Sequence, residues 1–175
     1  MRILGIDPGY ATVGFGVIDA EGGKLSFVDC GAIETAAGER IERRLKQIAD
    51  CLHALIERFH PDCVSMEELF FYHNQTTGIN VAQARGVLLY ICEMHALPVF
   101  EYTPMQVKSA VVGYGKAEKR QVMEMTKMLL KLPGVPRPDD AADALGIAIC
   151  HAHTAQSSLS HVNNRLAFAK KTAGR

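Results

Sequence analysis

The sequence predicts an α/β fold with a mixed five-stranded sheet covered by helices on both faces. Three short apolar runs separated by turn residues open the chain, which is typical of an antiparallel meander. After them, segments with helical periodicity alternate with further short apolar runs, a pattern typical of parallel strands joined by helices. At 175 residues, 48% of them apolar, the chain has the size and composition of one globular domain.

Turn residues delimit the first three strands. Pro8-Gly9 ends the first apolar run and Gly22-Gly23 ends the second, so each following run can fold back as an antiparallel neighbour. Gly14 and Gly16 in the second run indicate close backbone packing, because no lysine accompanies them as in a phosphate-binding loop. We expect these strands to span residues 2–7, 12–19 and 25–33.

Helices and two further strands alternate in the rest of the chain. Between residues 39 and 59 the apolar side chains recur every three or four positions, which predicts an amphipathic helix that ends before Pro61. Thr103 followed by Pro104 is typical of a helix N-terminus, and Asp139 is suited to begin the last helix. The remaining predicted strands are 63–69 and 98–102, and the predicted helices are 39–59, 74–95, 105–112, 117–132 and 139 to about 153.

Composition and charge exclude several classes of protein. No apolar run is long enough to cross a bilayer, and the opening segment lacks the apolar region of a signal peptide, so we expect a cytoplasmic protein with no membrane partner. Five widely spaced cysteines without a C-x-x-C pair argue against a disulfide framework and a thiolate zinc site. The net charge is zero, but residues 1–107 carry a net charge of −6 and residues 108–175 one of +6. Because binding to a polyanion depends on local potential, the zero total does not exclude nucleic acid.

Carboxylates follow two of the predicted strands and open the last predicted helix. Asp7 ends the first strand, Glu67-Glu68 lie near the end of the fourth, and Asp140 and Asp143 are one helical turn apart. Two carboxylates about 4 Å apart repel by roughly 4 kcal/mol at an effective dielectric of 20, so a cluster of three or four needs a divalent cation. Oxygen ligands suit Mg²⁺ or Mn²⁺, and a pair of such ions is a common arrangement for phosphodiester hydrolysis. Each carboxylate taken singly also fits a structural role, as a turn cap, a strand-end charge or a partner of the helix dipole.

Seven segments carry a resemblance to the RuvC Holliday junction resolvase family. They run in the family's order over nearly the whole chain and are GIDPG (5–9), MEELFF (66–71), QARG (83–86), PVFEY followed by QVK (98–108), AEKRQV (117–122), LLKLP (129–133) and DDAADAL (139–145). The resemblance implies a ribonuclease-H-like fold. We therefore expect a nuclease domain over residues 1–156, followed by a polar and basic tail over 157–175 that is partly disordered.

The activity that the resemblance implies is Mg²⁺-dependent resolution of four-way DNA junctions during recombination and DNA repair. Mn²⁺ is expected to substitute for Mg²⁺, with two ions in each active site. The family pattern further implies symmetric paired nicks in two opposed strands, leaving 5′-phosphate and 3′-hydroxyl ends. It also implies a homodimer that works with the RuvA and RuvB branch-migration proteins.

The family's catalytic and metal-binding quartet falls on Asp7, Glu67, Asp140 and Asp143 of this sequence. These are residues that the charge argument also selects. The choice of Glu67 over Glu68 comes from the family pattern. Neighbouring strand residues face opposite sides of a sheet, and spacing alone does not say which side holds the site.

The expected DNA contacts lie after the fourth strand and in the basic part of the chain. Lys108 and Lys119 match lysines that the family places close to the scissile strand, where a cation stabilises developing phosphoryl charge. Phe70 matches the family's aromatic residue that stacks on an unpaired base near the crossover. Lys116 and Arg120 belong to the same basic cluster, for which phosphate neutralisation and a solvated helix face are the two explanations.

Three other functions fit parts of the pattern. An I-D-x-G hairpin also begins actin-like and sugar-kinase-like ATP-binding proteins, although these need a second similar subdomain for which 175 residues leave no room. A junction-binding protein without catalytic activity, whose acidic residues are structural, is the non-enzymatic alternative. A related nuclease acting on RNA is the third. His151 and His153, two apart on the last helix, diverge by about 200° and are assigned packing or surface roles.

Overall fold

A mixed five-stranded sheet forms the centre of the molecule. The computed structural model describes the backbone of residues 1–68 and 75–172, and side-chain surroundings for 1–68 and 78–155. The strand order is β3-β2-β1-β4-β5, with antiparallel pairing within β1, β2 and β3 and parallel pairing of β4 with β1 and β5. The predicted meander and parallel strands are therefore confirmed. The strands are β1 (Arg2–Asp7), β2 (Thr12–Glu21), β3 (Lys24–Glu34), β4 (Cys63–Glu67) and β5 (Val99–Tyr102).

Five helices accompany the sheet within the described residues, and the first four lie close to their predicted positions. The third begins with the expected cap, since the Thr103 hydroxyl accepts a hydrogen bond from the backbone N–H of Gln106 and Pro104 follows it. The helices are α1 (Ile41–Phe59), α2 (Gln75–Met94), α3 (Pro104–Val112), α4 (Lys119–Leu129) and α5 (Asp139–Thr172).

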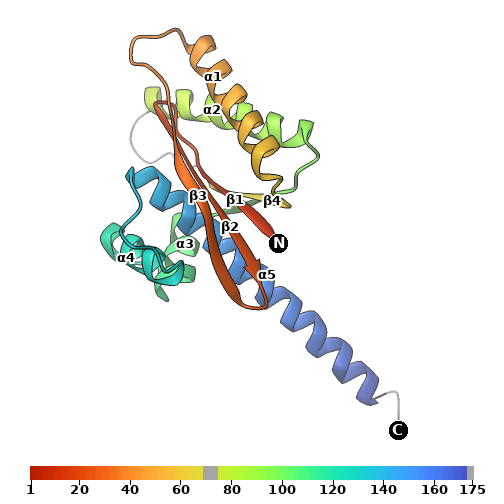
Figure 1. The fold of residues 1–175 in the computed structure, drawn as a ribbon. Helices are drawn as coiled ribbons and strands as arrows, with labels where there is room; N and C mark the ends of the chain where they lie inside the picture. Colours follow the sequence, from red (N-terminus) through yellow and green to blue (C-terminus); the bar gives the residue numbers. More distant parts are fainter. Residues whose placement is uncertain (69–74, 173–175) are drawn as a thin grey trace.

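The last helix is longer than the sequence pattern predicts. We expected it to end at about residue 153, but α5 continues to Thr172 and extends beyond the sheet (Figure 1). Neither proline nor glycine occurs between residues 153 and 172, so no residue of the segment stops the helix. Residues 173–175 lie outside the described part of the chain.

Each face of the sheet packs against its own set of helices (Figure 1). One core joins the sheet to α3, α4 and α5, and the other joins it to α1 and α2. Strand alternation divides β1 between them, because Ile3 packs in the α5 core whereas Leu4 and Ile6 pack in the α1–α2 core. All five cysteines are free, and none of the described helices has the length and hydropathy needed to span a bilayer.

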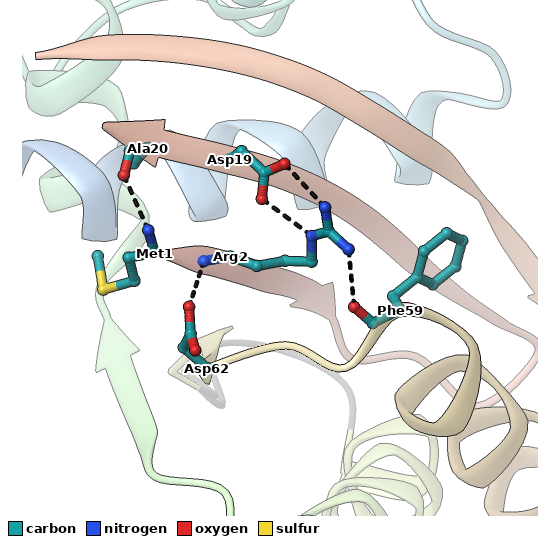
Figure 2. A network of polar contacts seen from close by, with 6 residues as sticks. All are labelled: Met1, Arg2, Asp19, Ala20, Phe59 and Asp62. Carbon is teal, nitrogen blue, oxygen red and sulfur yellow. Dashed lines mark hydrogen bonds and ion pairs between the residues drawn. The ribbon is translucent and has the colours of Figure 1, made fainter. Parts of the chain in front are cut away.

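A polar network at the start of β1 fixes the register of that strand (Figure 2). The Arg2 guanidinium donates to both carboxylate oxygens of Asp19 at 2.9 Å and to the carbonyl oxygen of Phe59 at 3.0 Å. The backbone N–H of Arg2 donates to Asp62, and the N-terminal amine donates to the carbonyl oxygen of Ala20. A register slip of one residue would turn every β1 side chain to the opposite face, so this network also determines which way Asp7 points.

Candidate active site

Asp7 ends β1 on the face of the sheet that α5 covers. Ile3, Gly5 and Asp7 alternate along β1 and share this face, and Ile3 packs in the core formed with α5. A Cβ atom added at Gly5 would lie 2.1 Å from the carbonyl oxygen of Ala144 in α5, so the helix backbone touches the strand. Asp7, two residues further on, is directed toward the first turn of α5.

Glu67 occupies the equivalent position at the end of β4. Ile6 of β1 pairs with Met66 of β4 in parallel register, so Asp7 and Glu67 lie level at the carboxyl ends of adjacent strands. Cys63 packs in the α5 core and Val64 and Met66 in the α1–α2 core, so alternation places Glu67 on the same face as Asp7. Glu68 is the next residue and falls on the opposite side of this alternation.

Asp140 and Asp143 approach the two strands because α5 begins directly against β2. Gly14 pairs with Asp7 across the β1–β2 hairpin. A Cβ atom at Gly14 would lie 2.1 Å from the carbonyl oxygen of Asp140, and one at Gly16 would lie 2.7 Å from the side chain of Leu145. The close packing predicted for Gly14 and Gly16 is confirmed, and it seats the acidic end of α5 beside Asp7.

A cavity of about 220 Å³ receives three of these carboxylates. Asp7, Glu67 and Asp143 line it together with Lys108 and Lys119. Apolar side chains complete its wall and are those of Pro104, Val107, Val122 and Ile147. The cavity therefore brings together residues from β1, β4, α3, α4 and α5, which are far apart in the sequence.

Burial and mutual repulsion shift the carboxyl pKa values in this cavity. Burial raises the pKa of Asp7 to about 7, helped by the charges of Glu67, Asp143 and Asp140. Burial also raises the pKa of Glu67, followed by the charge of Asp143, while Lys108 and Lys119 act in the opposite direction. Asp140 is thus an electrostatic neighbour of Asp7 even though it does not line the cavity. Carboxyl groups shifted in this way are typical of functional sites.

Lys119 is the counter-ion of the acidic cavity. Its Nζ lies 2.9 Å from Oδ2 of Asp143 and 3.9 Å from Oδ2 of Asp139, and the hydrogen bond to Asp143 raises the pKa of Lys119. Asp139 also accepts a hydrogen bond of 2.8 Å from Arg137. Asp139 was expected only to begin the helix, and its place in this ion-pair cluster could not be inferred from its position in the sequence.

The donor set of the cavity suits a hard divalent cation. All its acidic ligands are carboxylate oxygens, as Mg²⁺ and Mn²⁺ prefer, and the repulsion recorded in the pKa of Asp7 is what a bound cation relieves. In the described part of the chain, no three His, Cys, Asp or Glu side chains already form a metal-ligating cluster. The fit to a metal therefore depends on donor chemistry and charge.

The other expected DNA contacts lie at different distances from the cavity. Lys108 is half-buried and lines it, whereas Lys116 and Arg120 are exposed before and within the first turn of α4 and are absent from its wall. Phe70 lies outside the described residues. His151 is buried and stacks on Phe100 with ring centroids 4.3 Å apart, as expected for a packing residue.

Comparison with known proteins gives a consistent family match. The family model described as "Crossover junction endodeoxyribonuclease RuvC" matches residues 3–151. The RuvC protein of Brevibacillus brevis is 59% identical over 152 residues, covering 87% of this chain and 92% of the relative. The RuvC protein of Chloroflexus aggregans is 56% identical over 155 residues, covering 89% and 94% of the two chains.

Solved structures agree with this match. The structure of Thermus thermophilus RuvC superposes with a TM-score of 0.84 at 36% identity, covering 90% of this chain and 97% of that one. RuvC of the same species in complex with a Holliday junction substrate superposes with a TM-score of 0.83 at 34% identity, covering 90% and 96%. The yeast mitochondrial Holliday junction resolvase Ydc2, at 18% identity and a TM-score of 0.68, shares the fold.

Proposed function

The chain belongs to the RuvC family of crossover junction endodeoxyribonucleases, and from this premise we propose that it resolves four-way DNA junctions by Mg²⁺-dependent hydrolysis at Asp7, Glu67, Asp140 and Asp143. The proposed products are symmetric paired nicks in two opposed strands, with 5′-phosphate and 3′-hydroxyl ends. Mn²⁺ is expected to replace Mg²⁺, and two ions are expected in each site. The proposal includes a role in recombination and DNA repair in the cytoplasm, together with RuvA and RuvB.

The observation that carries the proposal is the convergence of three carboxylates and two lysines on one cavity. Asp7 and Glu67 are fixed by adjacent parallel strands and Asp143 by α5, so the set of oxygen ligands is held by regular structure. When bound, a pair of divalent cations supplies a nucleophilic hydroxide from water and stabilises the leaving oxygen. The protein carboxylates would hold the cations, and Val107, Val122 and Ile147 form the apolar part of the cavity wall beside them.

Lys108 and Lys119 provide the positive charge that a phosphodiester needs beside an acidic site. Lys108 reaches the cavity from α3 and Lys119 from α4, whereas Asp7 and Glu67 reach it from strands. An ammonium group there offsets the repulsion between a scissile phosphate and the carboxylates, and it stabilises the charge that develops during hydrolysis. Lys116 and Arg120 are proposed to bind phosphates further along the junction arms, and Phe70 to stack on an unpaired base.

A homodimer is proposed to deliver two cuts to one junction. The apolar residues Ile79, Tyr90 and Met94 are each at least 60% exposed on α2, and Gly86 on the same helix has open space around its Cα. The spacing from Ile79 through Gly86 and Tyr90 to Met94 places them along one side of the helix. A second copy packed there through the same surface gives twofold symmetry, which matches symmetric cutting of two opposed strands. The proposed nuclease domain covers residues 1–156, and the helical segment 157–172 lies outside it.

A cleavage assay on a mobile four-way junction tests the proposal. Purified protein should give paired, ligatable nicks with Mg²⁺ or Mn²⁺ and none with EDTA, whereas Asp143→Asn should bind the junction without cutting it. Binding without cleavage under all metal conditions would favour a junction-binding protein. Turnover of ATP would favour an actin-like protein, and a preference for an RNA–DNA duplex over the junction would favour an RNA nuclease.

A further inference from the structure

Arg44 is a buried arginine in the first turns of α1 that contacts the connection between β1 and β2. Its side chain is 6% exposed. The guanidinium carbon lies 3.5 Å from the centroid of the Tyr10 ring, and one guanidinium nitrogen donates to the carbonyl oxygen of Tyr10 at 3.3 Å. Nε of Arg44 donates to the hydroxyl of Thr35 at 2.7 Å. Arg44 therefore binds both the ring and the backbone of Tyr10.

Thr35 links Arg44 to the same connection from the other side. It follows β3, is 8% exposed, and its hydroxyl lies 2.9 Å from the Tyr10 carbonyl oxygen and 3.3 Å from that of Ala11. Its backbone N–H donates to the carbonyl oxygen of Ala11 at 2.9 Å. Two residues distant in the sequence thus hold two consecutive carbonyl groups of one turn.

The charge of Arg44 has no carboxylate partner in ion-pair contact among residues 1–68 and 78–155, whereas two other arginines of α1 have one. Arg43 pairs with Glu39, and Arg58 pairs with Asp29. Burying a charged side chain is costly unless it is paired or well hydrogen-bonded, and the partners of Arg44 are the turn residue Tyr10 and the hydroxyl of Thr35. An apolar or small side chain at position 44 would not carry this cost of burying a charge.

The turn that Arg44 holds is continuous with Asp7. Tyr10 and Ala11 follow Asp7 by three and four residues, and the buried Pro8 lies between Asp7 and Tyr10. On the other strand of the hairpin, Gly14 pairs with Asp7. A shift of the turn would therefore rotate the end of β1 and move the Asp7 carboxylate relative to Glu67 and Asp143. Small displacements of a positioned reactive group reduce rates strongly, by about 100-fold for an error of about 1 Å.

We propose that Arg44 is a positioning residue of the active site, which acts with Thr35 to hold the Tyr10–Ala11 turn and so to direct Asp7 into the cavity. The inference depends on the proposed function, because it takes Asp7 to be a metal ligand. The planar guanidinium stacks on a ring and donates to two acceptors at once, which a lysine ammonium does not do. Arg44 need not touch DNA or metal to have this effect.

Mn²⁺ binding without DNA, measured by titration calorimetry, tests this role separately from cleavage. Arg44→Met keeps the aliphatic bulk but removes the guanidinium with its hydrogen-bond donors, and Thr35→Val keeps the shape but removes the hydroxyl. Both variants should bind Mn²⁺ about tenfold more weakly than the unmodified protein. Both should also cut junctions about tenfold more slowly in single turnover, with junction affinity in EDTA unchanged. Arg43→Met, on the same helix with an exposed side chain, is the matched control and should change none of these quantities.

The double variant and a melting curve separate positioning from mere stability. Because Arg44 and Thr35 hold the same carbonyl, Arg44→Met combined with Thr35→Val should weaken Mn²⁺ binding no more than the worse single change. A lower Tm with unmodified Mn²⁺ affinity in either single variant overturns the proposal, and Thr35→Val decides if Arg44→Met does not fold. Asp7→Asn is the reference: if it leaves Mn²⁺ binding intact, the proposed site itself is wrong, whatever Arg44 does.

Discussion

Single residues determine the charge balance of the cavity. Asp7, Glu67 and Asp143 line it and repel one another, and the Lys119 ammonium forms an ion pair with Asp143. A group placed in this way is near the scissile phosphate in the proposed reaction, whereas the same charge on a distant helix face would only strengthen binding. Kinetics distinguishes these two roles, because a lysine near the scissile phosphate affects the rate of the chemical step and a distant one affects the affinity for DNA.

Lys119→Ala should reduce cleavage far more than binding. Loss of a preorganised cation beside the developing charge is expected to slow single-turnover cleavage by about 100-fold, with a much smaller change in junction affinity. Lys127→Ala, on the same helix but absent from the cavity wall, is the control and should leave the rate unchanged. A single-turnover rate that survives Lys119→Ala would show that this lysine serves binding alone.

The two adjacent glutamates should differ sharply in their importance. Glu67 lies on the α5 side of the sheet and lines the cavity, whereas the alternation of strand residues assigns Glu68 to the opposite face. Glu67→Gln removes a negative charge from the proposed metal site and should abolish cleavage while junction binding persists. Glu68→Gln should have a mild effect. A gel-based assay of binding and cutting on one junction measures both, and the reverse order would reassign the site.

Asp7→Asn should stabilise the metal-free protein at high pH. Because folding raises the pKa of Asp7 from 3.8 to about 7, the folded state holds its proton more tightly, and the free energy of unfolding falls as the pH rises between these values. The loss amounts to about 4 kcal/mol at most. In EDTA the variant should therefore equal the unmodified protein near pH 4 and exceed it at pH 8, as measured by urea unfolding. An identical difference at both pH values would contradict the pKa assigned to Asp7.

At the scale of elements, the seat of α5 on the β1–β2 hairpin positions the acidic end of the helix. Gly5, Gly14 and Gly16 leave no side chain between the strands and the helix backbone, and Asp140 is in direct contact with the strand at Gly14. The helix is therefore held at a distance that side chains larger than hydrogen do not permit. This contact connects a packing feature of the sheet to the spacing of the carboxylates.

Gly14→Ala should move α5 and with it the acidic residues. The new methyl group would meet the Asp140 carbonyl oxygen at 2.1 Å, so the helix must shift, at an expected cost of about 1–3 kcal/mol in unfolding free energy. Cleavage should fall by about 100-fold, since Asp140 and Asp143 shift together. Gly134→Ala, where a Cβ atom has open space, should affect neither stability nor rate. Unchanged cleavage in Gly14→Ala would show that the close seat of α5 is not needed for activity.

At the scale of the whole molecule, the proposed paired cutting requires two copies of the cavity. The exposed apolar side of α2 faces away from its packing with α1 and provides a surface on which a second copy can pack. Arg85 on the same helix forms an ion pair with Glu101 of β5, which fixes α2 to the edge of the sheet. The proposed dimer surface is thus connected to the sheet that carries Asp7 and Glu67.

Tyr90→Glu should convert the protein to monomers. A charge in the centre of an apolar interface is desolvated without a partner, so we expect dimerisation to weaken by at least about tenfold. The junction should then receive single nicks in place of paired ones. Sedimentation equilibrium measures the first effect, and nicks on a supercoiled cruciform plasmid measure the second. Met128→Glu, an equally exposed apolar position on α4, is the control; a dimer that persists in Tyr90→Glu would exclude α2 as its interface.

Local patterns were sufficient to predict the five strands and the first four helices. Side chains repeat their direction every two residues in a strand and every 3.6 residues in a helix. Both periods are visible among residues close in the sequence, so the positions of β1 to β5 and α1 to α4 could be derived from the chain itself. Short motifs such as GIDPG and DDAADAL also indicated the resemblance to one family. The end of α5 was missed because no proline or glycine marks it, and a polar composition does not by itself stop a helix.

The tertiary structure alone decided which side chains meet. Whether Glu67 or Glu68 faces Asp7 depends on the layer above the sheet, and the approach of Asp140 to Gly14 depends on how far a helix sinks onto a strand. The pairing of Lys119 with Asp143 and the contact of Arg44 with Tyr10 join residues separated by 24 and 34 positions. Sequence periodicity shows which face of each element is apolar. It does not show which residues of two elements touch, because those contacts form only when the elements pack together in layers.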